Sequence, residues 1–239
     1  MQLTFYSAWY CPFAQRAWIA LEHLGVPYSY QETDPYHKTE HWLDVSRGTG
    51  QVPVLQMLHQ DRSELRVPGS LRAVEYLDEI APNGRKLMPQ NVSARAEARF
   101  WIDHQNSNII PYFYRFLKAE IGSDAARLAE DSMTQNLLAF TNGMSPEGPY
   151  FFGAEPGIVD FSFAPFALRI ELLLSHYKTF QLPQTGEKWA RYGRWWQAMK
   201  SHPSFVATMP ELETYTARLL TFYVPYSQGG GQLDVTQIR

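Results

Sequence analysis

Cysteine is almost absent from this chain of 239 residues, which contains only Cys11. A single cysteine excludes an intrachain disulfide framework and any zinc site built from several cysteines. Three roles remain for it: a small buried residue, a lone metal ligand or a reactive thiol. Its setting along the chain therefore decides how the sequence is interpreted.

The sequence also lacks an excess of charge of either sign and a long apolar segment. Lysine and arginine number 21 against 24 acidic residues, and no basic run is typical of a nucleic-acid binder. A membrane span needs about 18 consecutive apolar residues, and the sequence has no such run. Residues 1–5 lack the positive charges of a secretory signal. We therefore expect a cytoplasmic protein that binds neither nucleic acid nor membranes.

Apolar residues are plentiful, at 45% of the chain with 15% aromatic, which is enough for a folded core. The length exceeds the roughly 100–200 residues of one typical domain and favours two. We expect an α/β domain at residues 1–84, a linker at 85–90, an all-helical bundle at 91–226 and a polar flexible tail at 227–239.

The first domain shows short alternating segments separated by helical periodicity. It is predicted to contain strands at 2–6, 26–31, 51–56 and 64–67 and helices at 14–24, 40–45 and 70–80. The first two strands should be parallel because a helix joins them, and the last two should form a hairpin. Periodicity alone indicates a small α/β domain, and this βαβ-ββα order is that of a thioredoxin-like domain.

Helical periodicity dominates the second domain, where no convincing strand is found. Helices are predicted at about 92–119, 124–142, 157–175, 187–200 and 210–222. Gly157 and Asp160 resemble a capping box, with the carboxylate reaching back to the backbone. Residues 161–174 are apolar on nearly every side, so this helix should form the centre of the bundle.

Cys11 lies between a predicted strand and a predicted helix and is followed by Pro12. Proline is favoured at the first position of a helix, so Cys11 is expected at the N-cap. Free N–H groups and the helix dipole stabilise a thiolate there, and such cysteines have pKa values of about 3.5–7.5 rather than about 8.5. This setting favours a reactive thiol. Without a second cysteine, any redox cycle needs an external thiol such as glutathione.

Several segments together resemble a cytosolic glutathione transferase. They are Cys11-Pro-Phe-Ala-Gln-Arg16, Val52-Pro53-Val-Leu55, Gly69-Ser70 leading into Glu75-Tyr-Leu-Asp-Glu79, and the cap at 157–160 with its apolar helix. The Cys-Pro-Phe-Ala form is similar to the omega class and its fungal and bacterial relatives. The resemblance implies a thioredoxin-like domain that binds glutathione, a helical domain that supplies the wall for a second substrate, and a homodimer.

The resemblance also assigns roles to individual residues. Cys11 would form a mixed disulfide or thioether with glutathione. Val52 and a cis Pro53 would present backbone groups to the cysteinyl part of glutathione, Ser70 would hold the γ-glutamyl carboxylate, and Lys38 would hold the glycyl carboxylate. The expected glutathione-binding set is Phe13, Lys38, Val52, Pro53, Gly69 and Ser70. An ordinary trans proline, an N-cap serine and a surface lysine are the structural alternatives.

Gly69 departs from the family pattern. The resemblance implies an acidic residue immediately before the serine, where its carboxylate pairs with the γ-glutamyl amino group, but this chain has Pro68-Gly69. Loss of a charge-assisted hydrogen bond costs on the order of 1.5–3 kcal/mol. Glutathione should therefore bind more weakly unless Asp61, Glu64 or a partner subunit substitutes.

Aromatic residues are the candidates for the second-substrate site. Trp9 and Tyr10 precede the thiol, and Tyr112 begins an aromatic run in the helical domain; packing in the core is their alternative role. His37 and His41 are four residues apart without surrounding carboxylates, so we expect no metal.

These observations predict a glutathione-dependent thiol transferase or reductase, of a dehydroascorbate reductase-like type, with glutathione as co-substrate and a hydrophobic or aromatic electrophile. Two alternatives remain open. One is a pathway-specific transferase or isomerase of an aromatic metabolite. The other is a non-catalytic binding or regulatory protein on the same scaffold.

Overall fold

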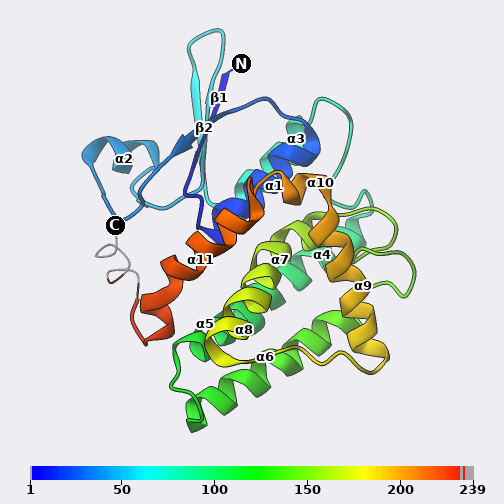
Figure 1. Cartoon of the computed structure of the whole chain (residues 1–239). Helices are drawn as coiled ribbons and strands as arrows, with labels where there is room; N and C mark the ends of the chain where they lie inside the picture. Colours follow the sequence, from blue (N-terminus) through cyan, green and yellow to red (C-terminus); the bar gives the residue numbers. More distant parts are fainter. Residues whose placement is uncertain (1, 232–233, 235–239) are drawn as a thin grey trace. The chain divides into compact units, whose positions relative to one another are not determined.

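The computed structural model describes residues 2–231 and residue 234 (Figure 1). The chain divides into two compact units. Unit 1 contains residues 2–88 together with Pro203–Thr208, and unit 2 contains residues 89–202 and the described residues from Met209 onward. The linker predicted at 85–90 stays a prediction, and most of the tail predicted at 227–239 lies outside the described residues.

Unit 1 is built on a four-stranded mixed sheet in the order β2-β1-β3-β4. Its strands are β1 (Gln2–Ser7), β2 (Ser29–Glu32), β3 (Val54–Leu58) and β4 (Glu64–Pro68). β1 pairs with β2 in parallel and with β3 antiparallel, and β3 pairs antiparallel with β4. The predicted βαβ unit and the hairpin are confirmed.

Two strands begin later than the sequence pattern indicates. Pro27 precedes β2 and Pro53 precedes β3, and neither residue has the N–H group that a strand ladder requires. The ladder therefore starts only after each proline.

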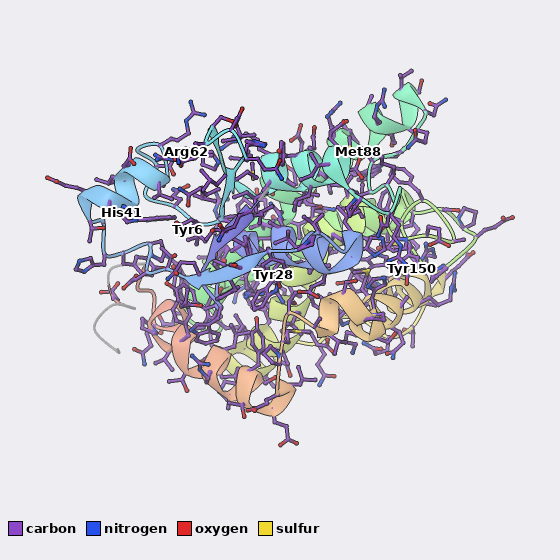
Figure 2. All side chains as sticks on the ribbon, turned by 90° about the horizontal axis from the view of Figure 1, so that it is seen from above. Tyr6, Tyr28, His41, Arg62, Met88 and Tyr150 are labelled. Carbon is purple, nitrogen blue, oxygen red and sulfur yellow. The ribbon has the colours of Figure 1, made fainter. Side chains whose placement is uncertain are left out.

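The turn between β3 and β4 contains Arg62, which has a φ of 67° (Figure 2).

Three helices complete the thioredoxin-like unit: α1 (Pro12–Leu24), α2 (Glu40–Val45) and α3 (Ser70–Ile80). α1 and α3 pack against each other, and the sheet contributes buried Phe5 and Leu55 to the core. Gly25 ends α1 in the left-handed conformation, at φ 63°, which glycine adopts without a steric penalty. The three helices lie where the sequence predicts them.

A late segment of the chain returns to unit 1. The short helix α10 (Pro203–Val206), which the sequence pattern did not indicate, packs against α1. The Gln15 side-chain amide donates to the Thr208 hydroxyl at 3.0 Å, and both residues are buried. This segment therefore satisfies a polar group inside the first unit.

Unit 2 is helical, as predicted. Its elements are α4 (Val92–His104), η1 (Gln105–Ile109), α5 (Ile110–Lys118), α6 (Asp124–Asn142), α7 (Ile158–Arg169), η2 (Ile170–Leu174), α8 (Ser175–Lys178), α9 (Glu187–Ser201) and α11 (Leu212–Ser227). η1 and η2 are π-helical segments inside the helices predicted at 92–119 and 157–175. Pro111 follows η1 and lacks the N–H that a regular α-helical turn would use.

α7 is the centre of unit 2 and is buried along its whole length. It packs against α4 and α9. Asp160 in its first turn accepts hydrogen bonds from the Gly157 and Phe151 N–H groups at 2.8 Å and from the Trp195 indole at 2.7 Å. The predicted cap and the buried central helix are confirmed.

Within the described ranges, no helix is both long enough and apolar enough to cross a membrane.

Candidate active site

Cys11 is the N-cap of α1. Its backbone is extended, at φ −79° and ψ 114°, and its thiol sulfur accepts a hydrogen bond from the Ala14 N–H at 3.5 Å. Pro12 occupies the first turn, and Cys11 as a residue is half-buried. The thiol therefore stands at the positive end of a helix of 13 residues, where a thiolate is stabilised.

The residues before the thiol are held by the end of the sheet. The Trp9 N–H donates to both carboxylate oxygens of Glu32 at 3.3 Å. Tyr10 is buried and stacks on Tyr36, with ring centroids 6.3 Å apart and an interplanar angle of 10°. Trp9 contacts Tyr10 edge to face and keeps part of its surface exposed. Of the two predicted substrate contacts in this unit, Trp9 is thus the more accessible.

Val52 and Pro53 are joined by a cis peptide bond, as expected. The carbonyl oxygen of Pro53 accepts the Gly69 N–H at 2.9 Å. This bond ties the segment before β3 to the start of α3, so two predicted parts of the glutathione site are adjacent in unit 1.

Ser70 is the first residue of α3 and Gly69 is its N-cap. Glycine has no side chain to accept the first N–H groups of the helix, which favours an anion from outside the chain at this position. Gly69 has a φ of 96°, which L side chains rarely adopt. A β-carbon at Gly69 would also collide with the guanidinium of Arg72.

Arg72 is exposed and its Nε donates to the Pro68 carbonyl at 2.7 Å. The side chain folds back over Gly69, so a cation occupies the region where the family resemblance implies a carboxylate. A guanidinium repels the γ-glutamyl ammonium and attracts the neighbouring carboxylate. The charge at this end of the site is therefore reversed from the expected one.

Asp61 and Glu64 do not compensate for the missing acid. Asp61 accepts from the Ser63 N–H and hydroxyl within the β3–β4 turn. Glu64 bonds to Gln56 and Arg66 at the far end of β4, about 13 Å from Pro68 at roughly 3.3 Å per strand residue. This geometry excludes both carboxylates as replacements for the acidic residue expected at position 69.

Lys38 and Phe13 are both exposed. The stem of Lys38 packs on Gly50, where an added β-carbon would lie 3.0 Å from two of its methylene carbons. Phe13 lies under the buried Arg16 guanidinium, 5.1 Å from the ring centroid. Their contacts with glutathione stay predictions.

Tyr112 belongs to unit 2, in α5. Its ring lies 4.9 Å from the Arg115 guanidinium carbon, a cation–π contact on the same helix. Its predicted role toward the second substrate is unchanged by this contact.

His37 and His41 are exposed, and His41 lies on α2 (Figure 2). In the part of the chain that the structure describes, no group of three or more histidine, cysteine or acidic side chains is arranged to hold a metal ion.

Sequence reasoning missed three residues around this site: Arg72, Glu32 and Tyr36. Arg72 carries a weak signal, because a residue three positions after an N-cap lies one turn above it. Glu32 and Tyr36 reach the Cys11 segment only through the folded sheet and the loop that follows it, and no local pattern indicates them.

Comparisons with known proteins agree with this geometry. Residues 10–80 match the family model described as the N-terminal domain of glutathione S-transferase. The chain is 30% identical over 215 residues to glutathione S-transferase U1 of Arabidopsis thaliana, covering 88% of this chain and 90% of the relative. It is 28% identical over 221 residues to pyrimidodiazepine synthase of Drosophila melanogaster, covering 92% and 85%.

Solved structures show the same fold. The crystal structure of glutathione transferase Omega 3C from Trametes versicolor superposes with a TM-score of 0.75 at 29% identity, covering 87% of this chain and 89% of that one.

Proposed function

Because the chain belongs to the glutathione S-transferase family, we propose that it is a cysteine-type, omega-like member that acts as a glutathione-dependent thiol transferase or reductase. Cys11 is the nucleophile. Glutathione is the co-substrate, and the second substrate is a disulfide or another electrophile with a hydrophobic group.

One observation carries this proposal: the only sulfur nucleophile of the chain is the N-cap of α1 and accepts the Ala14 N–H. Backbone N–H donors and the helix dipole lower the free energy of a thiolate relative to the thiol. Thiolates are the reactive form in exchange with disulfides. Similarity to an omega-class structure supports the same type of chemistry.

The reaction takes place in two exchanges. First, the Cys11 thiolate attacks the glutathione sulfur of a glutathionylated thiol; the new bond is Cys11–S–S–glutathione, and the released thiolate takes up a proton. Second, a glutathione thiol loses its proton and attacks the same glutathionyl sulfur, which gives glutathione disulfide and restores the Cys11 thiolate. Glutathione is thus oxidised and the substrate disulfide is reduced.

Glutathione is held, in this proposal, along the edge formed by Val52, Pro53 and Ser70, with Lys38 near its glycyl carboxylate. The uncapped N–H groups of α3 suit the γ-glutamyl carboxylate. The Pro53–Gly69 hydrogen bond keeps the two binding segments together.

Two variants test the proposal. In the Cys11→Ser variant, the rate of reduction of a glutathionylated peptide should fall at least 100-fold. The variant should still be retained on immobilised glutathione. Ser70→Ala should bind immobilised glutathione more weakly and keep a thiol that reacts with iodoacetamide. Full activity of the serine variant would exclude Cys11 as the nucleophile.

A second candidate is a glutathione-dependent transferase or isomerase specific for one aromatic metabolite. The observation that favours it is the similarity to pyrimidodiazepine synthase over 92% of this chain. A protein that is inactive on glutathionylated peptides but loses activity toward such a metabolite when Cys11 is replaced would support this candidate instead.

A third candidate is a non-catalytic ligand-binding protein. The Arg72 guanidinium beside Gly69 favours it, because a cation lies where the family pattern has a carboxylate. It predicts no retention on immobilised glutathione and an ordinary reactivity of Cys11. A homodimer and a cytoplasmic location also remain proposals. Light scattering of the purified chain tests the former, because a monomer mass would overturn it.

A further inference from the structure

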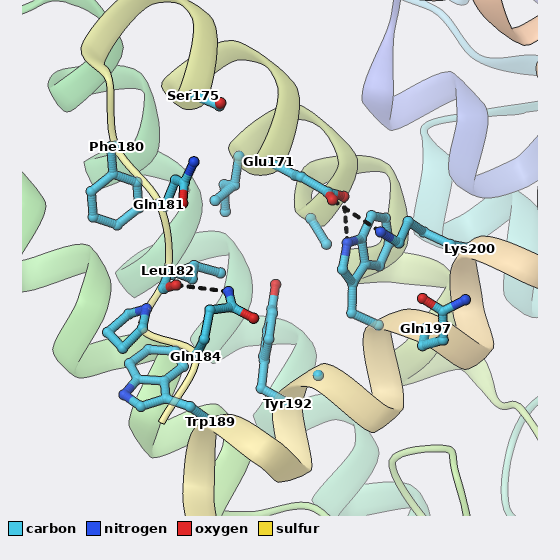
Figure 3. A pocket seen from close by; sticks show the side chains of 15 residues that line it. Glu171, Ser175, Phe180, Gln181, Leu182, Gln184, Trp189, Tyr192, Gln197 and Lys200 are labelled. Atoms are coloured by element: carbon cyan, nitrogen blue, oxygen red, sulfur yellow. Dashed lines mark hydrogen bonds and ion pairs between the residues drawn. The ribbon is translucent and has the colours of Figure 1, made fainter. Parts of the chain in front are cut away.

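Unit 2 contains a cavity that is separate from every residue assigned to glutathione above. It lies between α9, η2 and the segment that connects α8 to α9, and its volume is about 380 Å³ (Figure 3). Small-molecule sites in proteins have volumes of roughly 300–1,000 Å³. All its lining residues belong to unit 2.

One face of α9 supplies the aromatic wall. Trp189, Tyr192, Gly193 and Trp196 follow each other at spacings of three, one and three residues, so they lie along one side of the helix. Two indoles and a phenol ring line the cavity and offer apolar contact to a flat molecule, and the Lys200 ammonium lies 5.5 Å from the centroid of the Trp196 ring.

Gly193 keeps the cavity open. It lies in the interior of α9, where glycine costs roughly 0.5–1 kcal/mol relative to alanine. A β-carbon at this position would meet no atom within 4 Å. Neither packing nor a positive φ requires glycine here, and any larger side chain would project into free space.

Tyr192 provides a polar group without a partner. The residue is 4% exposed, and its hydroxyl forms no hydrogen bond with any residue that the structure describes. Figure 3 shows the hydroxyl pointing from α9 into the space between Gln184 and Glu171. Burial raises the pKa of Tyr192, so its O–H remains a donor at neutral pH. The hydroxyl is therefore a donor that opens onto the cavity and has no acceptor among the described residues.

The charged groups at the rim neutralise each other. Glu171 accepts from the Trp196 indole at 2.5 Å and from the Lys200 ammonium at 2.9 Å (Figure 3). Its carboxylate is therefore already occupied, and the paired charges give no net attraction for an ion.

We propose that this cavity binds a neutral, planar aromatic molecule with a carbonyl oxygen, which accepts the hydrogen bond of the Tyr192 hydroxyl while its ring packs between Trp189 and Trp196. The site is independent of the thiol chemistry of Cys11. It gives the helical unit a binding function of its own.

The test uses two matched probes, 2-acetylnaphthalene and 2-ethylnaphthalene, with binding followed by quenching of tryptophan fluorescence. The wild-type chain should bind the ketone more tightly than the hydrocarbon. Tyr192→Phe should weaken ketone binding about 5–10-fold, the equivalent of one neutral hydrogen bond, and leave hydrocarbon binding within two-fold.

Gly193→Leu fills the cavity and should abolish binding of both probes, with Gly193→Ala as a smaller change for the case that leucine impairs folding. Cys11→Ser should bind both probes as the wild type does. Equal affinity of the ketone for the wild type, Tyr192→Phe and Gly193→Leu would overturn the proposal, because the probe would then bind elsewhere. The Cys11→Ser control separates this result from failure of the thiol-transfer proposal.

Discussion

The guanidinium of Arg72 fills the space into which a side chain at position 69 would project. The turn into α3 depends on the φ of 96° at Gly69, and the exposed guanidinium places positive charge beside the N-terminus of that helix. It also gives a direct way to test how the site recognises glutathione.

Arg72→Glu should strengthen glutathione binding, because a carboxylate from position 72 would face the γ-glutamyl ammonium in place of a cation. We expect a gain of about ten-fold in affinity, the lower end of a charge-assisted hydrogen bond of about 1.5–3 kcal/mol, because the variant also loses the attraction of the guanidinium for the γ-glutamyl carboxylate. Arg72→Gln is the matched neutral control, and its affinity for glutathione should lie between those of the wild type and Arg72→Glu. Isothermal titration measures all three, and weaker binding by the glutamate variant would contradict this account of the charge.

The reactivity of Cys11 should depend on the folded helix. Its rate of alkylation by iodoacetamide is expected to reach half its maximum below about pH 8.5 in the folded chain and near pH 8.5 in denaturant. Since the chain has one cysteine, alkylation of a thiol, identified by the mass of the modified peptide, reports this atom alone. A folded-state midpoint at or above that of the denatured chain would show that the N-cap position does not activate the thiol.

Asp160→Asn should lower the free energy of unfolding by about 2–4 kcal/mol, because the amide would turn a donor toward one of the N–H groups of Phe151, Gly157 or Trp195. Asp131→Asn, on the exposed side of α6, should change it by less than about 0.5 kcal/mol. Urea unfolding monitored by circular dichroism measures both variants.

The same carboxyl group makes a pH-dependent contribution. Burial raises the pKa of Asp160 to about 6, against the opposing effect of its three N–H donors. The folded chain then binds more protons than the unfolded chain between about pH 4 and 6, so stability from this group falls as the pH rises through that range and is constant above it. The difference in unfolding free energy between wild type and Asp160→Asn should follow this curve; an opposite slope would refute it.

Two glycines in unit 2 should respond oppositely to alanine. Gly143→Ala would drive a methyl group into the Trp101 indole and should cost about 1–3 kcal/mol. Gly193→Ala has free space around the new methyl group and should stabilise the chain by about 0.5–1 kcal/mol. Thermal unfolding of the two single variants compares them, and a shift in the same direction would contradict the packing described here.

Local signals in the sequence were sufficient for the position of Cys11. A strand, a cysteine, a proline and a helix follow each other within a short segment, and the N-cap is defined by that order alone. The cap at Asp160 is local in the same way. The cis bond before Pro53 was expected from the family resemblance rather than from any pattern in the residues around it.

Features that depend on side-chain direction or distant contacts were not predictable. The path of the Arg72 side chain depends on several rotatable bonds, and its effect on Gly69 appears only in three dimensions. The cavity beside Gly193 is a space bounded by segments that the sequence does not show to be neighbours. α10 is four residues long, too short for a periodic signal.

The Gln15–Thr208 hydrogen bond can form only late in the synthesis of this protein. Translation proceeds from the N-terminus, so the bond from the buried amide of Gln15 forms only once Thr208, 193 residues later, has been made, after most of the helical unit. Until then the first unit lacks the segment Pro203–Thr208 that belongs to it. A truncated chain that ends at Met88 would lack this closure permanently.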